Sequence, residues 1–511
     1  MTSLRRNAIA NVLGRSVTAA LWVVATPFVL DRLGAERFGI WALFFAFSGY
    51  LTTFNLGIGN TMIRFIAAER ASEDRLAVRR TLGRGLWLAG ALGVFWALAV
   101  VVARSGIAGA FRVPAPLVPE TLQALLIFSL GVLLTFPIQV LAGSLQGFER
   151  LDLSNLCMVL GVAVHIVALY LGLTVGGGLR EVALAGVLGQ AVSGLLSALL
   201  VVVLVRRVRP GTGRPGPKWR ELLHFGAALQ MTNILSVLQL QVGKIMLGLL
   251  GTLAMVADYE LAFRVASGVA GIPYLILAAL IPTVSRVWKS DGPQAVTSLF
   301  TTSLRWLYTH TTITLGMLWL LAPDITRVWL GPKHDHVAVF IRLWAISYAA
   351  DLAWSPATAV ARGMGKPWIE VGSLIATVIM NAALGYWWVP LYGTSGAIAA
   401  MACSYSAGFV TYLAVSRRFG VTFGPWIRRE LLPRAAVAWL AVALCTLALA
   451  SGPLAVRFPS PGWAHGALTA ALYLSVFALF FLPFGDTQRM SRAVWHLVAG
   501  LTPRGREVAS S

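Results

Sequence analysis

Charged residues, and acids in particular, are scarce in this chain. Asp, Glu, Lys and Arg together make up 12% of its 511 residues, and the acids number 20 against 41 bases. Apolar residues make up 58%, and the mean hydropathy is +0.76. A soluble globule of this length could not hide so much apolar surface, so we expect the chain to fold in a lipid bilayer.

Motifs that would supply an energy source, a metal or a catalytic centre are also absent. The sequence holds no GxxxxGK[ST] phosphate loop, so ATP is not expected to drive it directly. The three cysteines lie in different apolar stretches with no His or Cys at ligand spacing, which indicates neither a disulfide framework nor a metal site. We expect no cofactor.

The excess of basic over acidic residues indicates contact with lipid rather than with nucleic acid. Its net charge is +21, but the basic residues are spread along short hydrophilic connectors and form no single basic face or arm. We therefore expect anionic lipid head groups as counterions and no nucleic-acid partner.

Fourteen apolar stretches are long enough to cross a membrane as helices with a rise of 1.5 Å per residue. They lie near residues 10–30, 38–58, 84–103, 121–142, 154–174, 182–205, 223–248, 254–279, 300–322, 338–360, 369–390, 395–415, 435–452 and 466–484. An even number of crossings leaves both termini on one side. With the termini inside, about 30 of the 41 Lys and Arg fall inside and about 9 outside, so the positive-inside rule predicts cytoplasmic termini.

Two loop patterns each occur twice along the chain, and the two copies are separated by nearly the same number of residues in both cases. The segment from Leu145 to Arg150 resembles the segment from Ala361 to Lys366, about 216 residues further on. Leu33-Gly34 likewise recurs as Leu250-Gly251. A six-span unit repeated in the same orientation is a known transporter plan, with the substrate path between the halves. We predict an N-terminal lobe over 1–205, a basic Pro/Gly linker over 206–220, a C-terminal lobe over 221–416, and two extra spans with a cytoplasmic tail over 417–511.

Polar side chains at helical spacing predict which spans line that path. They are Asn11, Arg15, Thr18 and Trp22 on the first span, Asn55 on the second, Gln230, Asn233, Gln241 and Lys244 on the seventh, and Glu260 and Arg264 on the eighth. Either they face a wet cleft, or the neutral ones hydrogen-bond between packed helices at about 0.6 kcal/mol apiece. For Arg15 and Arg264 we favour the cleft, because a guanidinium cannot lose its proton to escape the membrane.

Two lone charges near the middle of apolar spans, Arg264 and Asp351, are site hypotheses in themselves. Glu260 precedes Arg264 by one helical turn, in the order that favours an ion pair, so we expect the two to pair. Arg342 lies on the opposite face from Asp351 and cannot be its same-helix partner. A partner elsewhere, a bound cation or a proton must offset the burial of Asp351. With Glu260, it is the predicted ion-coupling site; a structural bond to another helix is the alternative.

The ordered motifs resemble one family. The segment L-G-x-x-x-F-G-I-W-A follows the first span, N-L-G-I-G-N ends the second, and L-Q-G-F-E-R-L-D follows the fourth. Together they resemble the polysaccharide-transport branch of the multidrug/oligosaccharidyl-lipid/polysaccharide flippase superfamily, from about Asn7 to Arg418. The resemblance implies an all-α polytopic membrane protein of about 14 transmembrane helices. Two parallel six-helix lobes are related by pseudo-two-fold symmetry, and two C-terminal helices follow them.

The resemblance also implies a function. Such a flippase moves undecaprenyl-diphosphate-linked oligosaccharide from the cytoplasmic to the periplasmic leaflet of a bacterial inner membrane by alternating access. Its partner proteins would be a polysaccharide polymerase or glycosyltransferases. Relatives that flip the peptidoglycan lipid precursor carry cavity arginines on spans one, two and eight, and Arg15, Arg64 and Arg264 occupy comparable spans here. The planar donor fork of Arg suits a diphosphate, while the neutral polar residues and Trp22 suit sugars.

Two other functions are weighed against this one. A cation-coupled multidrug antiporter of the same superfamily would use membrane acids such as Glu260 and Asp351, but Arg15 and Arg264 would repel a cationic drug. An integral-membrane glycosyltransferase or ligase would need a large non-membrane loop with catalytic acids or bases, and the sequence offers none. We therefore predict a transporter and not an enzyme.

Overall fold

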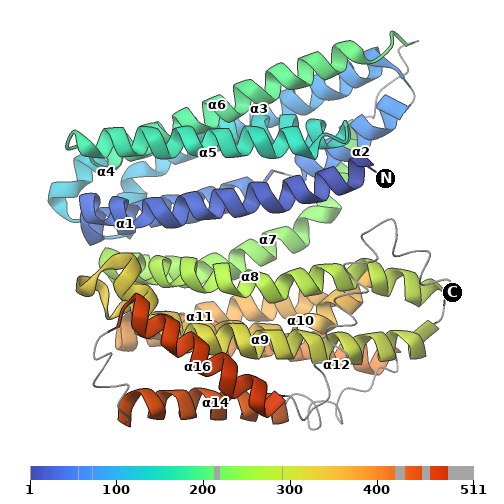
Figure 1. Cartoon of the computed structure of the whole chain (residues 1–511). Helices are drawn as coiled ribbons and strands as arrows, with labels where there is room; N and C mark the ends of the chain where they lie inside the picture. The colour runs from blue at the N-terminus through green and yellow to red at the C-terminus, as the bar shows by residue number, and fades with distance from the viewer. Residues whose placement is uncertain are drawn as a thin grey trace. The chain divides into compact units, whose positions relative to one another are not determined.

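The computed structural model is built from α-helices, and no strand occurs in the residues that it describes. These are residues 2–55, 57–71, 73–211, 219–290, 292–366, 368–419, 432–451 and 461–481. The helices are α1 (Thr2–Thr53), α2 (Ile58–Ala71), α3 (Arg75–Ala110), α4 (Val118–Gly147), α5 (Leu151–Thr174), α6 (Leu179–Arg207), α7 (Trp219–Leu250), α8 (Leu253–Ser290), α9 (Gly292–Leu330), α10 (Val337–Gly363), α11 (Trp368–Ser404), α12 (Gly408–Phe419), α14 (Leu432–Ser451) and α16 (Trp463–Phe481). Three short 3₁₀ turns join some of them (Figure 1). The predicted all-α class is confirmed.

The membrane class is confirmed as well. Within the described chain, eight stretches are helical, long and apolar enough to cross a bilayer. Each of the fourteen predicted spans overlaps a helix, so the predicted count is consistent with the structure. Long helices satisfy their own backbone hydrogen bonds, which is the condition for crossing hydrocarbon.

Glycines separate adjacent spans inside two of the longest helices. α1 has a non-helical residue at Gly34 (φ 74°, ψ 168°), and α11 has one at Gly393 (φ 55°, ψ −130°). Each falls where two predicted spans meet. A positive φ is open to glycine at little steric cost, so the chain can turn there between two apolar segments.

The helices group into two compact units. The first holds residues 1–261 with 378–400, and the second holds residues 262–377 with 401–511, each over the parts that the structure describes. These units are defined by which segments pack together. The lobes predicted over 1–205 and 221–416 are defined by the sequence repeat, so the two divisions are not the same. The predicted lobe boundaries therefore stay a prediction.

The repeated loop makes the same backbone hydrogen bonds in both copies. After α4, Phe148 N, Glu149 N and Arg150 N donate to Ser144 O, Gln146 O and Leu145 O at 2.9, 2.8 and 2.9 Å. After α10, Met364 N, Gly365 N and Lys366 N donate to Val360 O, Arg362 O and Ala361 O at 2.9, 3.0 and 2.9 Å. Every donor and acceptor is displaced by about 216 residues, as expected of a duplicated unit. Glu149 and Gly365 adopt the same left-handed conformation, with φ 60° and 72°.

A glycine one residue before each loop is enclosed in the same way. A Cβ on Gly147 would lie 3.0 Å from Ile63 O and 2.9 Å from Ile66 Cβ. A Cβ on Gly363 would lie 2.8 Å from Ile281 O and 2.7 Å from Val284 Cβ. In both copies the loop-bearing helix therefore approaches its neighbour so closely that no side chain fits between them.

The start of the predicted linker is fastened to the turn between α2 and α3. Arg75 Nε donates to Val208 O and Arg75 Nη2 to Arg206 O, both at 2.6 Å. The Asp74 carboxylate caps α3 by accepting from two backbone N–H groups at 3.0 Å. These contacts satisfy carbonyls that the end of α6 leaves without helical partners. Residues 212–218 of the linker lie outside the described chain.

The two C-terminal helices pack within the second unit. His465 Nδ1 of α16 lies 2.7 Å from Asp324 Oδ1 of α9, and Gly462 N donates to the same oxygen at 2.8 Å. Tyr473 Oη donates to Thr312 O at 2.8 Å. An apolar cluster of Leu320, Ala441, Val442, Cys445 and Tyr473 fills the space between α9, α14 and α16.

The close approach at the repeated loop leads to a first prediction. Gly147→Ala and Gly363→Ala should each destabilise the protein by about 1–3 kcal/mol, because the added methyl overpacks a helix contact. Gly83→Ala and Gly372→Ala are matched controls, since a Cβ at either position meets no atom within 4 Å. The melting temperature of the detergent-purified protein measures the difference. Equal melting temperatures for test and control variants would contradict the close approach.

Candidate functional site

Two of the predicted site residues form a buried ion pair in the first unit. Lys244 Nζ of α7 lies 2.6 Å from Glu260 Oε2 of α8, and the side chains are only 3% and 6% exposed. An unpaired charge inside a bundle of apolar helices is expensive, and a charge of opposite sign at contact distance compensates it. The two helices can come this close because of Gly243, where a Cβ would lie 2.6 Å from the Tyr259 hydroxyl oxygen.

This pair was not expected from the sequence. Glu260 was predicted to pair with Arg264 on its own helix, and that contact stays a prediction. The partner that the structure shows, Lys244, lies on a different helix, so no helical periodicity could reveal it. Arg264 lies one turn beyond Glu260 in α8 and is half-buried.

A second cluster surrounds Asp351 of α10 in the second unit. The Tyr274 hydroxyl of α8 donates to Asp351 Oδ2. The Ser355 hydroxyl donates to the main-chain oxygen of Asp351 at 2.9 Å and lies 3.4 Å from Oδ2. The ring of Tyr348 lies beside these groups, 6.4 Å from the ring of Tyr274 between centroids. The cluster therefore joins one carboxyl to two hydroxyl groups from α8 and α10.

No Lys or Arg among the described residues forms an ion pair with Asp351. Hydroxyl donors stabilise a carboxylate, and carboxylate and hydroxyl oxygens are also the ligands that hard cations prefer. The same oxygens can pass a proton between them. The described chain holds no group of three or more His, Cys, Asp and Glu that could bind a metal ion.

The remaining predicted substrate residues differ in their surroundings. Trp22 lies within the first unit with its ring 5.0 Å from that of His165 and 5.7 Å from that of Trp41. Arg64 is exposed on α2, with its guanidinium 5.5 Å from the Phe65 ring centroid. The side chains of Asn11, Arg15, Gln230 and Asn233 lie outside the described part of the chain.

Asn55 has a local structural role. Its side-chain nitrogen donates to Gln139 Oε1 of α4, and its Oδ1 accepts from Gly57 N at 2.8 Å. Gly57 has φ 66°, so this contact shapes the turn between α1 and α2. The bond to Gln139 is one of the interhelical hydrogen bonds that were weighed against the cleft for the neutral residues.

Thr18 and Gln241 fit the predicted polar substrate path better than Asn55 does. Both are half-buried, and Thr18 Oγ1 and Gln241 Oε1 are enclosed with no hydrogen-bond partner among the described residues. Such groups in an apolar protein call for water or a ligand, because an unsatisfied buried polar atom is costly.

Several neighbours of these groups were missed. Tyr274 lies on the same helical stripe as Glu260 and Arg264 in the sequence, but it was not among the predicted site residues. His165 and Gln190 line an 80 Å³ cavity of the first unit with Trp41, and Thr135 Oγ1 contacts Gln190 Oε1 at 2.9 Å. A lone histidine within an apolar span was the available signal for His165.

Comparisons with known proteins bear on the family and the fold of this chain. Residues 4–288 match the family model described as polysaccharide biosynthesis protein. A protein of Shigella flexneri described as a candidate O-antigen transporter is 23% identical over 409 residues, which cover 77% of this chain and 93% of that protein.

Two solved structures show the same fold. The inward-facing conformation of a multidrug resistance MATE family transporter of the MOP superfamily gives a TM-score of 0.68 at 17% identity, covering 82% of this chain and 98% of that one. A MOP superfamily transporter from Pyrococcus furiosus, whose binding pocket is described as having reverse polarity, gives 0.60 at 18% identity, with 82% and 95% covered. At this identity the likeness establishes the fold.

The Lys244–Glu260 contact gives a second prediction. Lys244→Met should destabilise the protein by about 3–5 kcal/mol, because Glu260 is then left buried without its partner. The double variant Lys244→Met/Glu260→Met should recover most of the loss. Lys333→Met, at an exposed lysine, is the control for removing one positive charge. Melting temperatures in detergent give the comparison, and a Lys244→Met variant as stable as the parent would rule out an essential pair.

Proposed function

Because the chain belongs to the polysaccharide biosynthesis protein family, whose model matches more than half of it, we propose that it is a flippase for lipid-linked oligosaccharide in surface polysaccharide or lipopolysaccharide synthesis. The family match carries the proposal. A relative described as a candidate O-antigen transporter and a fold shared with transporters support it. The multi-pass helical architecture suits a substrate that must cross the bilayer.

The substrate that fits the chemistry is an oligosaccharide on undecaprenyl diphosphate. Arg15, Arg64 and Arg264 would bind the diphosphate, since a guanidinium presents a rigid fork of donors to phosphate oxygens. Sugar hydroxyls would be held by Trp22 and by the neutral residues Asn11, Thr18, Asn55, Gln230, Asn233 and Gln241. Asn55 contributes least, because both ends of its amide are already engaged. Lys244 would act as part of its pair with Glu260.

Transport would proceed by alternating access, with no covalent bond broken. We place both termini in the cytoplasm of a bacterium, with the chain in the inner membrane, on the strength of the excess of Lys and Arg on that side. Its partners would be the lipid-linked oligosaccharide, anionic membrane lipids, and a polysaccharide polymerase or glycosyltransferases that act on the same glycan.

Asp351 would couple transport to an ion gradient. Its carboxyl lies among hydroxyl groups, and no described Lys or Arg pairs with it, so it can gain or lose a proton or bind sodium. Glu260 is less suited to this role than the sequence indicated, because Lys244 already compensates its charge. Asp351 is therefore the better candidate of the two acids.

A multidrug antiporter is the competing function, since solved structures of that class share the fold. An antiporter for cationic drugs needs uncompensated acids along its path. Asp351 would meet that need, but Lys244 compensates the charge of Glu260, and Arg264 brings a positive charge one turn away along α8. This charge balance favours an anionic substrate.

The third prediction tests the anionic substrate. Arg264→Ala should reduce export of lipid-linked oligosaccharide by roughly tenfold or more, since a hydrogen bond to a charged group contributes about 1.5–3 kcal/mol. Surface polysaccharide is measured in a strain that depends on this chain, with membrane abundance measured alongside. Arg79→Ala, at an exposed arginine, is the control. Full export by Arg264→Ala would refute this role, and loss of the protein from the membrane would indicate a structural one.

The fourth prediction tests ion coupling. Asp351→Asn keeps the shape of the side chain and its hydrogen bonds but removes the ionisable group. Transport in sealed vesicles should then no longer increase when a proton or sodium gradient is imposed, and Tyr274→Phe should weaken the increase. Asp335→Asn, at an exposed acid in the loop before α10, should respond like the parent. An unchanged gradient response in Asp351→Asn would remove the coupling role.

A further inference from the structure

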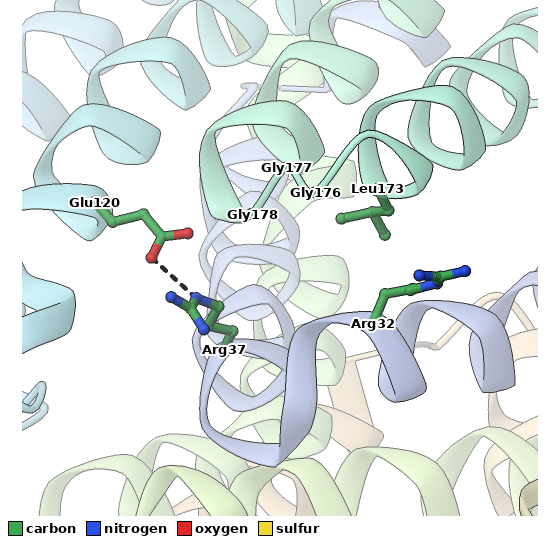
Figure 2. A pocket seen from close by; sticks show the side chains of 7 residues that line it. All are labelled: Arg32, Arg37, Glu120, Leu173, Gly176, Gly177 and Gly178. Atoms are coloured by element: carbon green, nitrogen blue, oxygen red, sulfur yellow. Dashed lines mark hydrogen bonds and ion pairs between the residues drawn. The ribbon is translucent and has the colours of Figure 1, made fainter.

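A pocket of about 290 Å³ opens at one end of the first unit, away from the residues discussed so far. It is lined by Arg32, Arg37, Glu120, Leu173 and the glycines Gly176, Gly177 and Gly178 (Figure 2). These residues come from α1, the first turn of α4, the last turn of α5, and the loop between α5 and α6. All of them lie at the ends of spans that the charge distribution places on the outer side of the membrane.

The single acid of this pocket is fully engaged by the protein. Glu120 Oε2 accepts from Arg37 Nε at 2.9 Å, and Glu120 Oε1 accepts from Leu179 N at 2.7 Å. The first backbone donor of the α6 N-terminus is also occupied, since Gly178 N donates to Glu181 Oε2 at 2.7 Å. Glu120 therefore fastens α1, α4 and α6 together, and Glu181 caps the start of its own helix.

The arginines keep donors that the protein does not use. Among the described residues, Arg32 contacts no carboxylate, and its guanidinium lies 5.6 Å from the Phe28 ring centroid. Arg37 uses Nε for Glu120, while the side chain stays 41% exposed and its two Nη atoms make no hydrogen bond to described residues. Figure 2 shows Glu120 facing Arg37 on one side of the pocket and Arg32 beneath Leu173 on the other. Among the lining residues two guanidinium groups face one carboxylate, and the carboxylate of Glu181 beside the loop is engaged by Gly178 N.

The glycine loop passes close to the carboxylates of Glu120 and Glu181. Gly176 has φ 85°, which ends α5. A Cβ on Gly178 would lie 2.0 Å from Glu120 Oε1, and a Cβ on Gly177 would lie 2.4 Å from Glu181 Cγ. Only glycine lets the backbone pass this close to the two carboxylates.

We propose that this pocket binds a phosphate head group at the outer surface of the membrane. Guanidinium groups bind phosphate oxygens with pairs of charge-assisted hydrogen bonds. At about 30 Å³ of liquid per water, the pocket has room for roughly ten waters, which is enough for one phosphate head group. The phosphate belongs either to a bilayer phospholipid or to the diphosphate of a polyprenyl carrier. This binding does not rest on the chain being a flippase.

The full-length protein, purified in a non-ionic detergent, is titrated with inorganic pyrophosphate, and the apparent Kd is obtained from the rise in melting temperature. Arg32→Gln should weaken binding about tenfold or more, which corresponds to about 1.4 kcal/mol. Arg180→Gln removes the same charge from the exposed first turn of α6 without touching the pocket and should leave the Kd within about twofold. Arg37→Gln should also weaken binding and lower the melting temperature without ligand, because it releases Glu120.

Two further titrations identify the source of the phosphate. Short-chain phosphatidylglycerol and a short-chain polyprenyl diphosphate are each added to the parent and to Arg32→Gln. Tighter Arg32-dependent binding of the first identifies a bilayer lipid, and tighter Arg32-dependent binding of the second identifies the lipid carrier. The proposal is overturned if Arg32→Gln binds pyrophosphate as tightly as the parent, or if Arg180→Gln weakens binding as much as Arg32→Gln does.

Discussion

The structure depends on one constraint, which is that bilayer hydrocarbon offers polar groups no hydrogen-bond partner. Helices satisfy this constraint for the backbone, and specific contacts satisfy it for the charged side chains. Lys244 meets Glu260, Asp351 meets two hydroxyl groups, and Asp324 meets His465. The contacts made by Lys244, Tyr274 and His465 each join two helices that are distant in sequence or separated by a turn. The few charges in this chain therefore both determine how helices pack and mark where function can reside.

The duplication preserves geometry more strictly than chemistry. The loops after α4 and α10 keep the same three backbone hydrogen bonds while their side chains differ. Asp351 of the second copy corresponds, at the same offset of about 216 residues, to Thr135 of the first, which contacts Gln190. An acid therefore occurs at this position in only one copy. A repeat that is symmetric in its packing but asymmetric in charge can assign substrate binding and ion coupling to different helices.

The balance of charge belongs to the side chains of this protein and not to the fold that it shares with drug transporters. A fold fixes where helices lie, and the side chains on them decide the substrate. Here a lysine compensates Glu260 inside the first unit, and arginines lie on α1, α2 and α8. The outer pocket has the same polarity, with two arginines against one glutamate. Both features suit the anionic substrate and the phosphate ligand that we propose.

The hydrophobic pattern was sufficient to predict the helices and the membrane, because both depend on local periodicity. The recurrence of short motifs was sufficient to predict the repeat. The apolar pattern also breaks at Gly34 and at Gly393, where each glycine lies between two predicted spans. The pairing of Lys244 with Glu260, the hydroxyls around Asp351 and the pocket of Arg32 and Arg37 could be seen only in the folded chain. They join different helices, and the rotation of one helix against another is decided by packing between side chains, which one-dimensional periodicity does not contain.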